Sequence, residues 1–167
     1  KARVQLLRDL GMSASPFNAW SILQGVETLS LRMDRHWSNT DKVVAFLQKQ
    51  GAVESINYAG LPSSPWHERA KKYFGGKGYG SVIAFVVKGG RENGQKFAEA
   101  LKLHSHVANI GDVRSLVIHP ASTTHSQLTE DEQRSAGVEP GLVRVSVGLE
   151  SIEDILADLQ LGFDAIK

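Results

Sequence analysis

The sequence contains no cysteine, almost no charge excess and no long apolar run, and each absence excludes a class of protein. Without cysteine in its 167 residues, the chain forms neither a disulfide framework nor a thiolate metal site. Lysine and arginine total 19 against 18 aspartates and glutamates, so the charge balance gives no indication of a nucleic-acid or anionic-membrane partner. No apolar run approaches the roughly 20 residues that span a bilayer. We therefore expect a cytoplasmic protein with no membrane and no nucleic-acid partner.

The chain is long enough to bury one core, because 41% of its residues are hydrophobic and its length falls within the usual range of a single domain. Its first residues, Lys1-Ala2-Arg3-Val4, include neither an initiator methionine nor the apolar stretch of a signal peptide. We expect this start to lie inside a longer polypeptide.

Helical periodicity dominates the first 50 residues. A turn is expected at Gly11–Ala14, and Ser15-Pro16 then supplies a helix N-cap followed by proline at the first helical position. A long helix over 16–37 follows, with an apolar face broad enough to contact two bodies. The polar residues at 38–40 are expected to cap a further helix that ends at Gly51.

Strand and helix patterns alternate from residue 51 onward. Thr129 and Glu132 have the spacing of a capping box, and Ser151 precedes the clearest amphipathic helix of the chain. This interleaving predicts an α+β fold with a mixed, largely antiparallel sheet and helices mainly on one face. Strands are expected at 53–58, 81–87, 107–109, 115–118 and 142–147, and helices at 66–74, 91–103, from 129 and from 151 to 166.

Two segments have the composition of ligand sites but lack the required context. The glycine-rich stretch 75–80 runs from a helix into a strand, whereas phosphate loops run from a strand into a helix N-terminus, so we interpret it as a flexible connector. His104 and His106 would share one face of a strand, but no spacing supplies the further ligands that a metal needs. We expect no metal site.

Arg144 is the most informative single residue. Period-two alternation places Val143 and Val145 on one face of a strand and Arg144 on the other. An arginine among apolar residues needs an anion, and its planar fork holds a carboxylate through two parallel hydrogen bonds. That anion is either an aspartate or glutamate of the same domain or the carboxylate of a ligand, and the pattern alone leaves both open.

The stretch 109–126 joins a short strand to a long polar loop rich in hydroxyl and imidazole groups. Loops longer than a connection requires are often functional, although a hydrogen-bonded surface loop has the same composition.

Several ordered motifs resemble the carboxyl-terminal signature of the Cys/Met metabolism family of pyridoxal-phosphate (PLP) enzymes. Upstream segments resemble the helix that bridges the two domains in this family, so the resemblance covers nearly the whole chain. The motifs are Ser15–Ala19, Gln24–Leu29, Arg32-Met33 with His36, Asn109–Asp112 with Ser115-Leu116, His119–Ser126, and Val143–Glu150 with Asp154-Ile155.

The resemblance implies the small domain of a fold-type I PLP enzyme, with residues 1–50 bridging to a missing large domain and residues 51–167 forming the small domain. It implies that Arg144 binds the α-carboxylate of an amino-acid substrate, with Asn109 and Ile110 beside that carboxylate and Thr124 near the same pocket.

The family's catalytic lysine lies in a Ser-x-Thr-Lys context, and none of the ten lysines here does. The resemblance therefore implies that this chain contains no catalytic residue, does not bind PLP by itself and is inactive alone. Its partners would be the missing N-terminal PLP-binding portion and further copies in a homotetramer.

Within the family, Arg8–Met12 and Thr123–Leu128 look most like O-acetylhomoserine sulfhydrylases, which make homocysteine in methionine biosynthesis. Cystathionine γ-synthase, O-succinylhomoserine sulfhydrylase and γ-lyase share the framework and are alternatives. A free-standing α+β binding or regulatory module, with Arg144 in an internal ion pair, is the alternative of another class.

Overall fold

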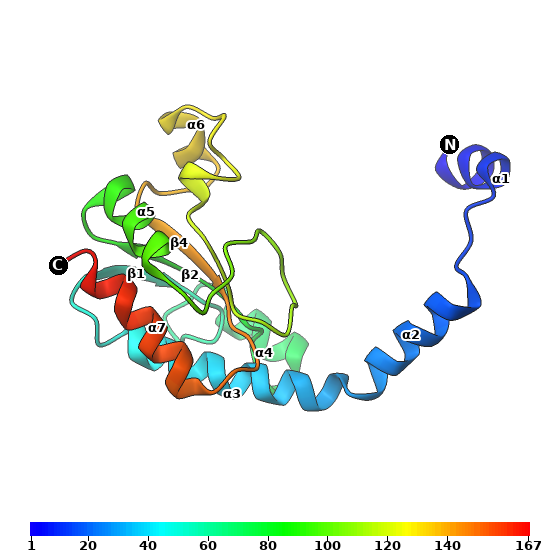
Figure 1. Cartoon of the computed structure of the whole chain (residues 1–167), viewed down its shortest axis with the longest axis horizontal. Coiled ribbons are helices and arrows are strands. Elements are labelled where there is room, and N and C mark those ends of the chain that lie inside the picture. Colours follow the sequence, from blue (N-terminus) through cyan, green and yellow to red (C-terminus); the bar gives the residue numbers. More distant parts are fainter. The chain divides into compact units, whose positions relative to one another are not determined.

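A computed structural model describes residues 1–167 and divides them into two compact units, Lys1–Arg32 and Met33–Lys167 (Figure 1). The first unit contains a π-helical turn at Ala2–Leu6, α1 (Leu7–Leu10) and α2 (Pro16–Glu27). Gly11, with φ of 65°, ends α1, and the Ser15 side chain accepts a hydrogen bond from the Asn18 N–H at 3.1 Å. The predicted turn and cap are thus confirmed.

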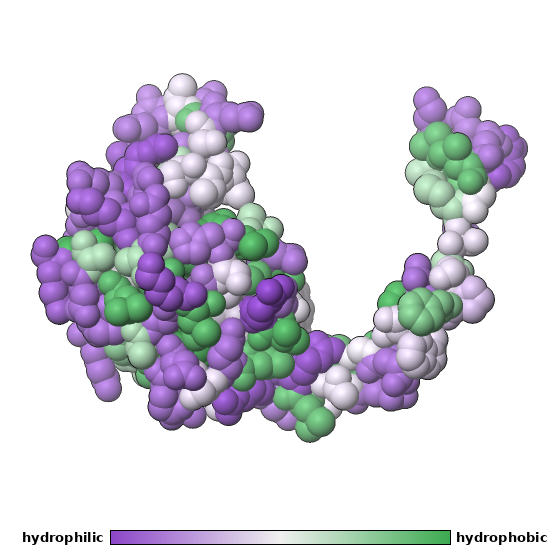
Figure 2. All heavy atoms as spheres, viewed as in Figure 1, coloured by the Kyte–Doolittle hydropathy of each residue, from purple (hydrophilic) through white to green (hydrophobic).

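The helices of the first unit bury none of their residues. Its exposed apolar side chains are visible in Figure 2. The largest exposed fractions are those of Val4 (71%), Phe17 (71%), Leu10 (69%), Leu31 (69%), Ile22 (64%) and Leu23 (61%).

Helix α3 (Leu29–Leu47) runs from the last residues of the first unit into the second, and its course differs from the prediction. The helical segment breaks at Thr28, not at residues 38–40. The predicted cap was wrong because these polar side chains make other bonds: Thr40 Oγ donates to the carbonyl of His36, and Asn39 reaches the distant residues 148 and 150. An intrahelical bond of Thr40 and tertiary bonds of Asn39 therefore accommodate these polar residues inside a continuous helix.

The sheet contains four strands in the order β1-β2-β4-β3, and every neighbouring pair is antiparallel. The expected α+β fold is confirmed, as are four of the five expected strands. The strand expected at 107–109 was wrong, because these residues form no regular structure and the N–H groups of Val107 and Asn109 bond to carbonyls two residues earlier, not to a neighbouring strand. The strands are β1 (Val53–Asn57), β2 (Val82–Val87), β3 (Leu116–Ile118) and β4 (Leu142–Ser146).

The remaining helices follow the predicted positions to within a few residues. The capping box at the start of α6 is present in full, with Thr129 and Glu132 bonding to each other's backbone N–H groups. At Ser151, by contrast, no side-chain cap forms, because its hydroxyl donates to Glu153. These helices are α4 (His67–Phe74), α5 (Gly90–Ala100), the 3₁₀ turn Pro120–Ser122, α6 (Glu130–Ser135) and α7 (Ile152–Asp164).

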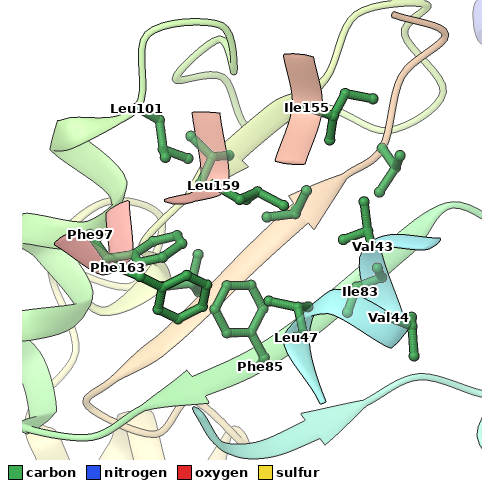
Figure 3. Packing of buried hydrophobic residues seen from close by; sticks show 14 of the residues in the cluster. Val43, Val44, Leu47, Ile83, Phe85, Phe97, Leu101, Ile155, Leu159 and Phe163 are labelled. Carbon is green, nitrogen blue, oxygen red and sulfur yellow. The ribbon is translucent and has the colours of Figure 1, made fainter. Parts of the chain in front are cut away.

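The core lies between one face of the sheet and helices α3, α5 and α7 (Figure 3). Three aromatic rings form its centre: the Phe97 ring lies 5.5 Å from that of Phe85 and 4.8 Å from that of Phe163, both in edge-to-face arrangements. Leu47 and Ile155 are also fully buried. Each such side chain contributes about 1.5–3 kcal/mol through burial. None of the helices has the length and apolar character needed to cross a membrane.

Candidate substrate-carboxylate site

Arg144 lies in the middle of β4, a central strand of the sheet. Val143 and Val145 point into the core and are fully buried. The alternation therefore directs Arg144 to the opposite face, where Ala84 of β2 and Ile118 of β3 are its direct cross-strand neighbours. A small residue on one side leaves room for the long arginine side chain.

The guanidinium of Arg144 has no partner within the chain. Arg144 is half-buried, and it takes part in none of the six ion pairs and in none of the side-chain hydrogen bonds. Its guanidinium nitrogens are not among the buried atoms without a partner, so they remain accessible to an anion, which a guanidinium can bind through two parallel hydrogen bonds. The arrangement thus favours an anion from outside this chain over the internal ion pair.

The other predicted residues lie in the two connections that flank β3, next to β4. Asn109 and Ile110 are exposed in the connection before β3, and the Asn109 side chain accepts the N–H of Ile110 at 2.8 Å. Thr124 is exposed in the connection after β3, with its hydroxyl 2.9 Å from Nδ1 of His125. No hydrogen bond joins any of the three to Arg144. The three residues thus lie in the connections on either side of β3, the strand that pairs with the strand of Arg144.

Helix α3 holds the backbone that continues from β4, a feature that the sequence analysis missed. Nδ1 of His36 donates to Val147 O at 2.6 Å, and Asn39 Nδ2 donates to Gly148 O and Glu150 O, both at 3.0 Å. His36 and Asn39 are buried. Their i, i+3 spacing within an apolar helical stripe was the available signal, because buried polar side chains need partners.

Two histidines near these connections make internal bonds. His104 Nδ1 donates to Asp158 at 2.7 Å, and His119 Nε2 donates to Pro140 O at 2.8 Å. Burial lowers the pKa of both histidines, and this outweighs the opposing effect of Asp158 on His104. Burial also raises the pKa of Asp158, but hydrogen bonds from His104 and from backbone N–H groups lower it overall. No group of three or more potential metal ligands forms.

A cavity of about 110 Å³ opens beside α5 and β3. Glu99, His106, His119 and Thr123 contribute to its lining, and Arg144 does not. Pockets for small molecules usually enclose about 300–1,000 Å³. This cavity is therefore smaller than a typical small-molecule pocket.

The residues present do not fit a covalently attached PLP. All ten lysines are exposed, whereas a lysine that forms a Schiff base must be desolvated enough to lose its proton readily. The glycine-rich segment 75–80 follows α4 and precedes β2, so it does not lie at a helix N-terminus that could receive a phosphate. No step of a reaction can therefore be assigned to a cofactor held by this chain alone.

Comparison with known proteins identifies the family. Residues 1–164 match the family described as Cys/Met metabolism PLP-dependent enzyme. The chain belongs to this family. It is 59% identical over 160 residues to the O-acetyl-L-homoserine sulfhydrylase of Leptospira meyeri, and 55% identical over 166 residues to that of Corynebacterium glutamicum. These alignments cover 96% and 99% of this chain.

A solved structure of the family has the same fold. The putative O-acetylhomoserine (thiol)-lyase of Campylobacter jejuni, which carries a pyridoxyl-lysine monophosphate, aligns with a TM-score of 0.87 at 40% identity. The match covers 98% of this chain and 38% of that structure. Likewise, the chain spans only 36% and 38% of the length of the two sulfhydrylases. In this family, then, the chain corresponds to little more than a third of a complete protein.

Proposed function

We propose that this chain is the substrate-carboxylate-binding portion of an O-acetylhomoserine sulfhydrylase. The complete enzyme would convert O-acetylhomoserine and sulfide to homocysteine and acetate, with PLP held by the rest of the polypeptide. The observation that carries this proposal is the unpartnered, half-buried Arg144 on β4. The names of the relatives at 59% and 55% identity support the choice of substrate.

Arg144 would bind the α-carboxylate of the amino-acid substrate. Its two parallel N–H groups match the two carboxylate oxygens, and its charge persists in a partly desolvated site. A substrate gripped at this end presents its Cα and side chain in one orientation to the remaining part of the enzyme. Asn109, Ile110 and Thr124 would border the bound carboxylate from the connections on either side of β3.

The domain division belongs to the same proposal. Residues 1–50 would form the helical segment that bridges to the PLP-binding portion, and residues 51–167 would form the small domain. The exposed apolar side chains of the first unit support this, because contiguous exposed apolar surface commonly marks an interface. We further propose that the complete protein is a cytoplasmic homotetramer.

The test is the replacement of Arg144 by alanine and by lysine in the complete enzyme. Losing a charged, bidentate contact costs about 1.5–3 kcal/mol, so KM for O-acetylhomoserine should rise roughly 10- to 150-fold in Arg144→Ala. The KM of Arg144→Lys should lie between those of the wild type and Arg144→Ala, because lysine keeps the charge but lacks the planar guanidinium group. KM for sulfide and the PLP content should stay unchanged.

Arg134→Ala is the matched control, because Arg134 is an exposed arginine paired with Glu139 at the end of α6. It should leave every kinetic constant unchanged. If KM for O-acetylhomoserine is also unchanged in Arg144→Ala, Arg144 does not bind the substrate. Absence of homocysteine from O-acetylhomoserine and sulfide in the wild-type enzyme would refute the assigned reaction.

A further inference from the structure

Loop 106–114, which carries Asn109 and Ile110, is held at its two ends and exposed between them. At its base the Ser105 N–H donates to Ser115 O and the Val117 N–H donates to Ser105 O, both at 2.9 Å. The first stem is also fixed by Asp158, which accepts the backbone N–H of His104 at 3.0 Å. Within the loop, the exposed fractions are 49% for Val107, 61% for Ile110 and 49% for Val113.

Glu150 fixes the second stem of the loop. One carboxylate oxygen accepts the Ser115 N–H at 2.7 Å, and the other accepts the Ser115 hydroxyl at 2.9 Å. That hydroxyl in turn accepts the Gly148 N–H at 2.9 Å, and the Leu149 N–H donates to Val113 O at 2.8 Å. Ser115 is fully buried. Backbone and side-chain hydrogen bonds from segment 147–150 therefore hold the end of the loop.

The segment 147–150 is itself rigidly placed relative to Arg144. It follows the end of β4 directly, and the Val147 N–H donates to Ser81 O at 2.8 Å. On its other side it accepts the hydrogen bonds from His36 and Asn39 of α3. The strand of Arg144 is therefore connected to loop 106–114 through segment 147–150 and the hydrogen bonds between Glu150 and Ser115.

The charge of Glu150 has no cationic partner. It is absent from all six ion pairs, and the neighbouring Arg114 lies on Asp112 instead. Its recorded side-chain bonds all come from Ser115. Hydrogen bonds from neutral donors to a carboxylate are stronger than those to a neutral acceptor. Glu150 is therefore built into the loop attachment and not into a surface charge pair.

We propose that Glu150 is a positioning residue for the substrate's carboxylate. By holding Ser115, it keeps loop 106–114 at a fixed place beside the strand of Arg144, so that both approach the same carboxylate in one geometry. This inference rests on the function proposed above for Arg144. Without Glu150 the loop would sample more positions, and substrate binding would bear the entropic cost of ordering it.

The test uses Glu150→Ala, Glu150→Gln and Ser115→Ala in the complete enzyme, with Glu153→Ala as the control. Glu153 has the same charge, is exposed and accepts a side-chain hydrogen bond only from Ser151, the residue before α7. Glu150→Ala should raise KM for O-acetylhomoserine about tenfold, the equivalent of about one lost hydrogen bond to a charged group, with kcat and KM for sulfide unchanged. Glu150→Gln, which keeps an acceptor for the Ser115 N–H, should recover much of this loss. Glu153→Ala should behave as wild type.

Two further measurements separate positioning from general stability. Amide hydrogen exchange in residues 106–115 should accelerate in Glu150→Ala but not in Glu153→Ala. Glu150→Ala should also add little to the KM of Arg144→Ala, because both act on one carboxylate. If Glu150→Ala does not fold, the same measurements of KM and amide hydrogen exchange are made on Glu150→Gln and Ser115→Ala.

The inference is overturned if exchange in the loop accelerates while KM for O-acetylhomoserine is unchanged, or if the two KM effects multiply in the double variant. It is also overturned if exchange in the loop does not change at all. Failure of the proposed function is a different result: wild-type enzyme would not convert O-acetylhomoserine, whereas the exchange response to Glu150→Ala would remain.

Discussion

Whether Gly162→Ala on α7 raises or lowers the free energy of unfolding depends on packing around the new methyl group. Alanine is favoured over glycine in a helix interior by about 1 kcal/mol. A Cβ at Gly162, however, would lie 2.6 Å from Cε2 of Phe97, well inside van der Waals contact. Phe97 is completely buried and wedged against Phe85 and Phe163 (Figure 3), so its ring has nowhere to move. Overpacking of this kind costs about 1–3 kcal/mol.

We therefore expect Gly162→Ala to destabilise the second unit by about 1 kcal/mol net, despite its better helix propensity. Amide exchange of the peptide over residues 152–164 in the complete protein should become about fivefold faster. In a Phe97→Leu background the smaller side chain frees the space, and the same substitution should become stabilising. Slower exchange in the single variant, or an equal effect in both backgrounds, would refute the packing argument.

Two other predictions concern acid stability and helix capping. The folded pKa values of His104 and Asp158 lie below their ordinary values of 6.5 and 3.8, so the unfolded state binds more protons and stability should fall as pH drops below about 6.5, and again below about 3.8. The thermal midpoint of the complete protein should decline accordingly, and Asp158→Asn should reduce the lower step without abolishing it, because five other carboxyl groups also have lowered pKa values; a midpoint independent of pH between about 7 and 5 would contradict this. Thr129→Ala removes the capping box of α6 and should lower its local stability by about 1 kcal/mol. Amide hydrogen exchange in residues 130–135 should become faster in Thr129→Ala but not in Ser135→Ala, which leaves the cap intact.

Much of the fold follows from the sequence because its signals are local. The alternation in β4, the capping box at Thr129 and the stripe of α7 each depend on neighbours within a few residues, and each was found in the structure. The helix break was misplaced because polar residues 38–40 resemble a cap, while Thr40 bonds within the helix and the partners of Asn39 lie more than 100 residues away. Local preference was outweighed by a tertiary contact that no short window contains.

The candidate site could be predicted only in part for the same reason. Alternation showed that Arg144 needs an anion, but only the structure shows that the chain supplies none. Glu150 and Ser115 belong to recognisable motifs, yet their partnership spans 35 positions and leaves no periodic trace. Glu150 and Ser115 are identified only in the structure, where the segment that follows β4 bonds to the end of the connection before β3.

The hold of α3 on the segment 147–150 has a consequence for which substitutions the protein tolerates. His36 and Asn39 bond to carbonyl oxygens, which every residue type possesses, so this attachment does not depend on the side chains at Val147 or Leu149. Gly148 is the exception, because a Cβ there would collide with the backbone of residues 114 and 115. Substitutions of His36, Asn39 and Gly148 should therefore be poorly tolerated. Positions 147 and 149 should accept other residues of suitable size.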